Sequence, residues 1–213
     1  MKIYCISGIG ADHRMFRHIL APEGHELVEI GYITPIEGES LRDYSIRLSA
    51  GIDTSEPFAL LGLSLGGIIC VEIARRLSPV GTIIIGSIPI SAQMPGYFKL
   101  AGRLHLAQFI SPSLLKSAAI LKRLFSNESP EDKRVIRKMI RDGNSIFIKW
   151  ALQAVLEWDN EQPPAPLWHI HGTRDEVFPI GYTKPTHIIR KGGHTLVMSH
   201  PAEINRILRE AIG

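Results

Sequence analysis

Cysteine is scarce in this sequence. The 213 residues contain two, Cys5 and Cys70, and both lie in apolar runs. Neither belongs to a C-x-x-C pair or to a Cys/His spacing typical of zinc sites. The sequence therefore predicts neither a disulfide framework nor a metal site. It predicts reduced core thiols, as is usual in a cytoplasmic protein.

Long apolar runs are also missing. A helix that spans a bilayer needs about 20 consecutive apolar residues, and no stretch of this sequence approaches that length. The first residues, MKIYCISGIGADHR, place one lysine before a short apolar run that ends in glycines, which indicates a first strand rather than a signal peptide. We therefore expect no stable membrane insertion and a cytoplasmic location.

The chain as a whole lacks an excess of charge of one sign. Its formal net charge is +3, which does not indicate a nucleic-acid partner. Residues 96–150, however, contain eleven Lys and Arg against four Asp and Glu, so this segment carries +7 and the remainder −4. Solvated helix faces account for such a distribution. Alternatively, the basic segment favours anionic substrates, carrier proteins or membrane surfaces.

The sequence shows a regular alternation of short apolar runs and amphipathic stretches. The runs are rich in β-branched residues and bounded by Gly, Pro or Ser, which is typical of strands buried on both faces of a parallel sheet. They cover residues 2–8, 25–33, 57–64, 80–87, 167–172 and 186–192. Helical patterns cover residues 40–50, 66–77 and 201–212. The alternation predicts an α/β fold, with an open, mainly parallel sheet of about six strands and helices on both faces.

Residues 90–160 interrupt this rhythm. Two stretches, 111–125 and 129–143, open with Ser-Pro, a favourable N-cap and first-turn pair, and residues 145–158 form a third helical pattern. Three consecutive helices between two strands predict a helical cap inserted into the fold. We therefore expect two parts, an α/β core formed by residues 1–89 and 160–213, and a cap (lid) formed by residues 90–159.

The stretch GLSLGG, residues 62–67, follows one predicted strand and precedes a helix. Gly62 and Gly66 flank Ser64 at positions −2 and +2, as a nucleophile elbow requires, because a Cβ at either position would collide across the sharp turn. An ordinary Gly/Ser turn between strand and helix is the alternative. No Gly-Lys-Ser/Thr follows, which argues against a phosphate-binding loop.

A serine hydroxyl becomes an effective nucleophile when a base takes its proton and an acid orients that base. Asp175 follows the predicted strand 167–172, and His194 follows the strand 186–192 in a Gly-rich loop. Ser64, Asp175 and His194 thus come at carboxyl ends of predicted strands, where open α/β sheets bind ligands. The weaker rivals are Glu176 for the acid, and His171 and His200 for the base.

The loop after the first strand, SGIGAD, offers further backbone donors. An oxyanion hole is commonly built from paired backbone N–H groups. Leu65 follows the serine, and Ile9 lies between Gly8 and Gly10 in this loop. The same glycines begin a G-x-G-x-x-G dinucleotide pattern, but its third glycine position is His13. We therefore predict that the N–H groups of Ile9 and Leu65 form an oxyanion hole.

The motifs SGIGAD, GLSLGG, HGTRDEVFP and KGGHTLVMSHP, in this order, resemble those of the α/β-hydrolase superfamily. They cover nearly the whole chain outside the cap. The resemblance implies that Ser64 is the nucleophile, Asp175 the acid and His194 the base. It also implies that Ile9 and Leu65 supply the oxyanion N–H groups and that the inserted helices form a lid.

This chain departs from the family pattern in two places. Ser7 stands where a histidine is usual, and we expect this to alter support of the oxyanion loop more than the chemistry. The first predicted strand leads directly into that loop, so two leading strands typical of the family are expected to be absent.

These residues predict hydrolysis of a carboxylic ester or thioester through an acyl-enzyme, with no metal or organic cofactor. The expected partner is a small-molecule acyl substrate, and the basic cap favours an anionic one. Two alternatives stay open: a C–C bond hydrolase or lyase-type enzyme using the same three residues, and a ligand-binding homologue without catalysis. The cap supplies apolar candidates for pocket walls, most of which also fit an ordinary helical core: Met94, Phe98, Leu104, Phe109, Phe147, Trp150 and Trp158.

Overall fold

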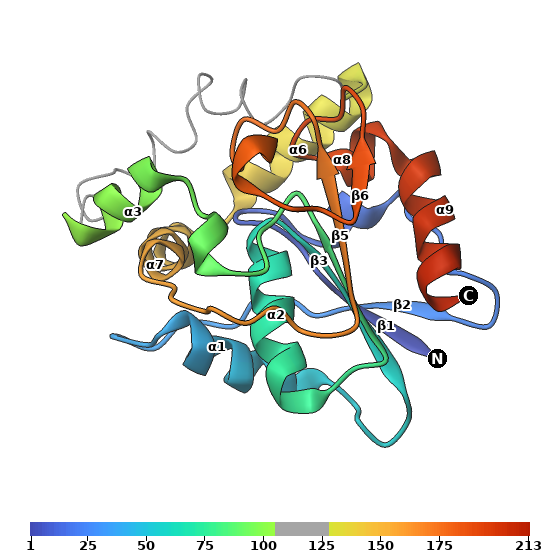
Figure 1. Ribbon diagram of the computed structural model, residues 1–213, viewed down its shortest axis with the longest axis horizontal. Helices are drawn as coiled ribbons and strands as arrows, with labels where there is room; N and C mark the ends of the chain where they lie inside the picture. The colour runs from blue at the N-terminus through green and yellow to red at the C-terminus, as the bar shows by residue number, and fades with distance from the viewer. Residues whose placement is uncertain (105–127) are drawn as a thin grey trace.

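A single parallel sheet forms the centre of the molecule. The computed structural model describes residues 1–104 and 128–213, and in these residues six strands pair in the order β2-β1-β3-β4-β5-β6 (Figure 1). Each neighbouring pair is parallel, so the predicted open parallel sheet is confirmed. The strands are β1 (Lys2–Ile6), β2 (Glu26–Glu29), β3 (Phe58–Leu63), β4 (Gly81–Ile85), β5 (Leu167–Gly172) and β6 (His187–Ile189).

Helices cover both faces of this sheet, as the sequence predicts (Figure 1). One face carries α1 (Leu41–Leu48) and α2 (Leu65–Leu77), and α7 (Ser145–Leu156) joins this buried layer through α1. The other face carries α8 (Leu196–Ser199) and α9 (Pro201–Ile212), and α6 (Pro130–Asp142) joins this layer beside the 3-10 helix η1 (His13–Phe16). α3 (Gly96–Arg103) packs on α7. Short 3-10 turns complete the described elements: η1 (His13–Phe16), η2 (Ser49–Gly51), η3 (Ser91–Gln93) and η5 (Ile180–Tyr182). Across residues 1–104 and 128–213, none of the helices is long and apolar enough to cross a membrane.

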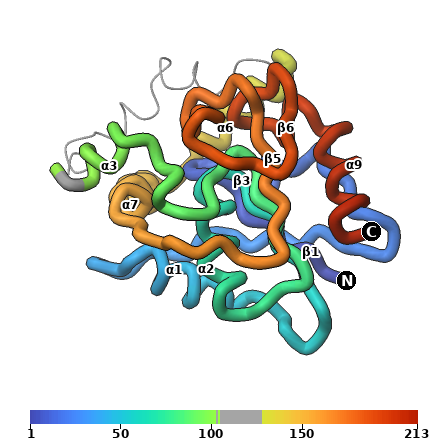
Figure 2. The backbone as a smooth tube through the Cα atoms, in the orientation of Figure 1, coloured from blue at the N-terminus to red at the C-terminus, as the bar shows by residue number. Residues whose placement is uncertain are grey.

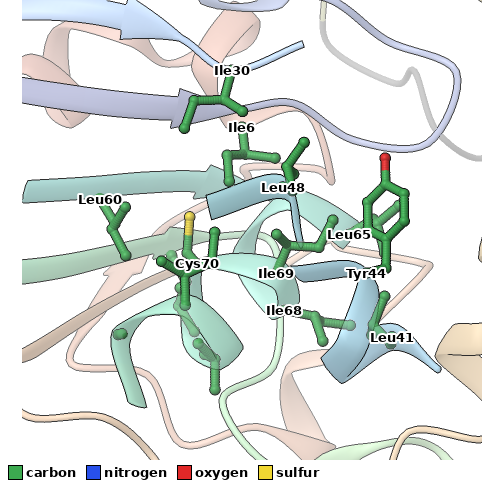
Figure 3. Close-up of a cluster of buried hydrophobic side chains, with 14 of the residues drawn as sticks. Ile6, Ile30, Leu41, Tyr44, Leu48, Leu60, Leu65, Ile68, Ile69 and Cys70 are labelled. Carbon is green, nitrogen blue, oxygen red and sulfur yellow. The ribbon is translucent and has the colours of Figure 1, made fainter. Parts of the chain in front are cut away.

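The alternation of side chains along the strands divides the core into two layers. In β1, Tyr4 and Ile6 join the layer of α1 and α2, and Ile3 and Cys5 join the layer of α8 and α9. Figure 3 shows the first layer, where Cys70 of α2 lies among aliphatic side chains. The two thiols are therefore buried and free, as predicted, and they lie on opposite faces of the sheet.

Five of the six strands are shorter than the apolar runs that predicted them, and β2, β4 and β6 differ most from those runs. β2 ends at Glu29. Beyond it, the N–H of Ile33 donates to the hydroxyl oxygen of Tyr44, and the Tyr44 hydroxyl donates to the carbonyl of Ile33. β4 and β6 are followed by residues with left-handed backbone, Gly86 at φ 52° and Lys191 at φ 61°. Such conformations leave the extended region and end a strand.

The helices predicted at 129–143 and 145–158 are α6 and α7, and the one predicted at 111–125 lies outside the described residues. α6 is capped by Ser129, whose Oγ accepts the N–H of Asp132 at 3.0 Å. α7 is joined to α2 where the indole N–H of Trp158, just after the helix, donates to Glu72 Oε1 at 2.8 Å. The sequence did not predict α3 or α8. α8 is four residues long and gives a weak periodic signal, and α3 begins at Gly96 without a side-chain cap that would mark its start.

Because the strands share one direction, the sheet has an amino edge and a carboxyl edge. Both termini lie at the amino edge (Figure 2): Lys2 begins β1, and Ile212 packs beside Gly81 at the start of β4. The loops that follow β1, β3, β5 and β6 gather at the carboxyl edge, and the candidate site residues lie in those loops.

Candidate active site

Ser64 occupies the single residue between β3 and α2. Its backbone has φ 55° and ψ −120°, a combination that L-residues rarely adopt and that recurs at functional turns. The N–H of Ser64 donates to the carbonyl of Ile85 at 2.9 Å, and the hydroxyl of Ser87 donates to the carbonyl of Ser64 at 2.7 Å. The end of β4 therefore holds this strained turn in place.

The glycines around Ser64 are required by close backbone approach. A Cβ at Gly62 would be 2.4 Å from the carbonyl oxygen of Gly66, and a Cβ at Gly66 would be 2.0 Å from the carbonyl oxygen of Ile6. The predicted collisions are thus confirmed. A Cβ at Gly67 would likewise be 2.5 Å from the Ser87 hydroxyl, a requirement that the sequence did not reveal.

The structure brings Ser64, His194 and Asp175 into one line of contacts. His194 Nε2 lies 2.9 Å from Ser64 Oγ, and His194 Nδ1 lies 2.9 Å from Asp175 Oδ2. Ser64 is half-buried, whereas His194 and Asp175 are buried. Three loops from separate parts of the chain therefore place a hydroxyl, an imidazole and a carboxylate within hydrogen-bond distance of one another.

Asp175 is held as a carboxylate. Its Oδ1 accepts the N–H groups of Val177 at 2.8 Å and Phe178 at 2.9 Å. Burial acts to raise the pKa of Asp175, but the charge and hydrogen bond of His194, together with His171 and the Phe178 N–H, outweigh it and lower the pKa below its ordinary value. A carboxylate so placed fixes His194 with Nδ1 protonated and Nε2 facing the serine.

His171, a rival for the base, is buried behind Asp175. Its Nε2 lies 2.7 Å from the carbonyl oxygen of Phe178 and 3.4 Å from Asp175 Oδ2. Its Nδ1 lies 3.2 Å from Nε2 of His169. Burial lowers the pKa of His171, although Asp175 opposes the shift, so the ring is neutral and donates its Nε2–H to the carbonyl.

The sequence analysis missed His169. The signal that reveals it is the His-x-His spacing within β5, because residues two apart on a strand share a face. The other rivals lie away from the line of contacts: Glu176 is exposed, and His200 bonds the Ser199 hydroxyl at the start of α9.

The loop after β1 lies directly against Ser64, since a Cβ at Gly8 would be 3.3 Å from Ser64 Cβ. The hydroxyl of Ser7 donates to the carbonyl of Ala11 at 2.9 Å, and the Tyr32 hydroxyl donates to the carbonyl of Ser7. Ser7 therefore stabilises the loop from within. Among hydrogen bonds between described residues, none uses the backbone N–H of Ile9 or Leu65.

The family model described as "Alpha/beta hydrolase family" matches residues 3–207. The chain belongs to the alpha/beta hydrolase family. The resemblance noted in the sequence is thus confirmed. A search of curated proteins found no match to this α/β hydrolase.

Solved structures of the same fold resemble this α/β hydrolase over nearly its whole length. MenH from S. aureus aligns with a TM-score of 0.77 at 16% identity, covering 100% of this chain and 93% of that one. An esterase from Exiguobacterium antarcticum aligns with a TM-score of 0.76 at 18% identity, covering 99% and 91%. A thermophilic esterase from Thermogutta terrifontis aligns with a TM-score of 0.70 at 16% identity, covering 99% and 88%. At these identities the likeness concerns the fold.

This α/β hydrolase also has a cavity of about 240 Å³ beside the loop after β1. Its lining comes from the loops after β1 and β2 and from the junction of α6 and α7: residues 10–12, 32–34, 139, 142–144 and 147. Within residues 1–104 and 128–213, no group of three or more His, Cys, Asp or Glu side chains has the arrangement of a metal site.

Proposed function

We propose that this protein is a serine hydrolase that cleaves a carboxylic ester or thioester through an acyl-enzyme. The observation that carries the proposal is the line of contacts from Ser64 Oγ to His194 Nε2 and from His194 Nδ1 to Asp175 Oδ2, each 2.9 Å long. It begins at a strained strand-to-helix turn, and all three groups lie at the carboxyl edge of the sheet.

In the first half of the reaction, Ser64 Oγ attacks the substrate carbonyl carbon while its proton passes to His194 Nε2. Asp175 stabilises the imidazolium that forms. The N–H groups of Ile9 and Leu65 donate to the carbonyl oxygen as it becomes an oxyanion. Loss of one such donor typically raises the activation barrier by about 3 kcal/mol. His194 then returns the proton to the leaving oxygen or sulfur, and the acyl group stays on Ser64.

In the second half, His194 takes a proton from a water molecule, and the water oxygen attacks the acyl carbon. The same two N–H groups hold the second oxyanion. Collapse of this intermediate releases the carboxylic acid and returns the proton to Ser64 Oγ. The cycle uses three side chains and two backbone N–H groups of this chain, together with one water molecule.

We propose further that residues 90–159 act as a cap over this site. Their basic segment, which carries +7 across residues 96–150, favours a substrate with an anionic leaving group, such as a carrier thioester. If acyl-carrier thioesters turn over no faster than neutral esters of equal chain length, and salt leaves the rates unchanged, this part of the proposal is wrong.

The serine is tested by labelling with a fluorophosphonate, which phosphonylates an activated serine with loss of fluoride. The protein should be labelled, and Ser64→Ala and His194→Ala should each abolish labelling. Ser55→Ala and His200→Ala are matched controls that should retain it, because Ser55 is exposed and His200 lies at the start of α9. An unlabelled native protein, together with no turnover of esters or thioesters, would refute the proposal.

A further inference from the structure

Glu128 is a buried carboxyl group in the proposed cap, one residue before the N-cap of α6. It is 4% exposed, and its Oε1 accepts a hydrogen bond from the hydroxyl of Thr195, which is 3% exposed. Its Oε2 is buried and has no hydrogen-bond partner among residues 1–104 and 128–213, and no cation of those residues pairs with the carboxyl. Burying such a group lowers stability, so its position indicates a role other than packing.

The donor to this carboxyl is the neighbour of the candidate base. Thr195 directly follows His194 and is the N-cap residue of α8, where its carbonyl accepts the N–H of Met198 at 3.0 Å. On its other side, the carbonyl oxygen of His194 lies against the end of β4, since a Cβ at Gly86 would be 2.7 Å from it. The backbone of His194 is therefore bounded by Gly86 and by Thr195, and the side chain of Thr195 is bonded to Glu128.

The segment that carries Glu128 has anchors of its own. The next residue, Ser129, caps α6 by accepting the N–H of Asp132 at 3.0 Å, and Asp132 Oδ1 lies 2.9 Å from Nε2 of His18, which follows η1. α6 and α8 belong to the same buried layer on one face of the sheet (Figure 1). Because these contacts fix the start of α6 independently of Thr195, the Glu128 carboxyl is a fixed acceptor for the Thr195 hydroxyl.

We propose that Glu128 is a positioning residue for His194: through the hydroxyl of Thr195 it fixes the backbone that carries the base. The inference rests on the proposed serine hydrolase function and adds a residue of the cap to it. His194 Nε2 must serve Ser64 Oγ, the leaving atom and water in turn, and a displacement of about 1 Å in such a group can lower the rate about 100-fold. Glu128 itself takes no proton in the cycle, because its hydrogen bond ends on Thr195.

The test removes the hydrogen bond from either end. Glu128→Leu and Thr195→Val each delete one partner without adding a polar group. With one p-nitrophenyl ester, each variant should lower kcat by at least about tenfold and change KM by less than about twofold. The double variant should be no slower than the slower single variant, because the same bond cannot be lost twice.

Conservative variants of the same two residues should restore activity. Glu128→Gln keeps an oxygen that can accept the Thr195 hydroxyl, and Thr195→Ser keeps the hydroxyl, so each should retain kcat within about threefold of the native value. Glu131→Leu is the matched control in the same segment. Its carboxylate is 64% exposed and pairs with Arg17 on the surface, and such a pair contributes little, so this variant should keep the native kcat.

Urea unfolding separates this role from a purely structural one. Replacing a buried donor and acceptor together by apolar groups of similar shape is close to neutral for stability, so the slow double variant should unfold at or above the native urea midpoint. If Glu128→Leu fails to fold, Thr195→Val, which has nearly the same shape as the native residue, decides the question.

Three results would overturn the inference while the native protein remains an active hydrolase. The first is native kcat in both Glu128→Leu and Thr195→Val. The second is Glu128→Gln as slow as Glu128→Leu, which would assign the effect to charge. The third is a slow double variant with a lowered urea midpoint. If instead the native protein cleaves no ester or thioester and is not labelled by a fluorophosphonate, the proposed function fails, and this inference fails with it.

Discussion

Ser64 combines a backbone conformation that costs about 1–3 kcal/mol with two hydrogen bonds to the end of β4. Its N–H and its carbonyl oxygen are both used, so the turn cannot relax without breaking a bond to the neighbouring strand. The orientation of the hydroxyl is therefore a property of the sheet as well as of the GLSLGG sequence.

Gly66 is the position where a single methyl group should do most damage. Its Cβ would be 2.0 Å from a backbone oxygen of Ile6 in β1, and backbone cannot move aside as a side chain can. Gly66→Ala should lower the free energy of unfolding by at least about 3 kcal/mol, measured by urea denaturation. Gly51→Ala, with nothing within 4 Å of its Cβ, should change it by less than about 0.5 kcal/mol. Equal stabilities would contradict the steric explanation.

We expect His171 to act as a positioning residue, because its Nε2 contacts the carbonyl of Phe178 and the carboxylate of Asp175. His171→Phe removes the donor to the buried carbonyl of Phe178, at a cost of about 1–3 kcal/mol, and loosens the backbone that carries the acid. We expect kcat for ester hydrolysis to fall about tenfold with little change in KM.

His171→Gln keeps a side-chain N–H that can reach the same carbonyl, and it should recover most of the kcat. Steady-state kinetics with one ester should compare kcat and KM of the two His171 variants with those of the native protein. Equal losses of kcat in both would show that the imidazole itself, and not its hydrogen bond, is needed.

At the scale of elements, the sequence predicted all six strands but, apart from β5, not where each one ends. The presence of a strand depends on a local run of β-branched residues, which can be recognised in the sequence. Strand ends depend on contacts with distant residues. After β2, for example, the backbone N–H and carbonyl of Ile33 form hydrogen bonds with the hydroxyl of Tyr44 and not with a neighbouring strand. The same distinction holds in the site. Ser64, Asp175 and His194 were predictable because each follows a strand, whereas the pairing of His169 with His171 depends on burial.

α6 is bounded by a cap that the sequence also revealed. Ser129 Oγ accepts the N–H of Asp132 at 3.0 Å and donates to its carboxylate at 2.7 Å. Ser129→Ala should lower the free energy of unfolding by about 1 kcal/mol, measured by urea denaturation. Ser145→Ala is the control at the first residue of α7, where Asn144 supplies the cap. An equal loss of unfolding free energy in both variants would show that the side-chain cap of Ser129 does not stabilise the protein.

For the whole molecule, the buried histidines of β5 make stability depend on pH. Burial, and then the electrostatic interaction with His171, which opposes a second positive charge on β5, lower the pKa of His169 from 6.5 to about 3. Between these values the unfolded chain binds a proton that the folded protein does not, so stability falls as pH decreases. From pH 7 to pH 5 this group alone should remove about 2 kcal/mol from the free energy of unfolding.

Urea denaturation at pH 7 and pH 5 measures this loss. His169→Gln should show a loss smaller by about 2 kcal/mol. His13→Gln, whose imidazole is 70% exposed, should follow the native protein. His171, with its pKa also lowered by burial, acts in the same direction. Asp175, whose pKa is depressed, contributes stability that is lost only at more acidic pH. A native loss that His169→Gln leaves unaltered would contradict the assignment to His169.

The two free thiols, Cys5 and Cys70, can serve as probes of local unfolding of the two core layers. Burial raises the pKa of Cys5 to about 12 and that of Cys70 well above its ordinary value, and alkylation requires a thiolate that reagent can reach. Each cysteine is therefore modified only when its own layer separates from the sheet. Cys70 reports on the layer of α1 and α2, and Cys5 on the layer of α8 and α9. Comparing their alkylation rates under native conditions, peptide by peptide, distinguishes one cooperative opening from two independent ones.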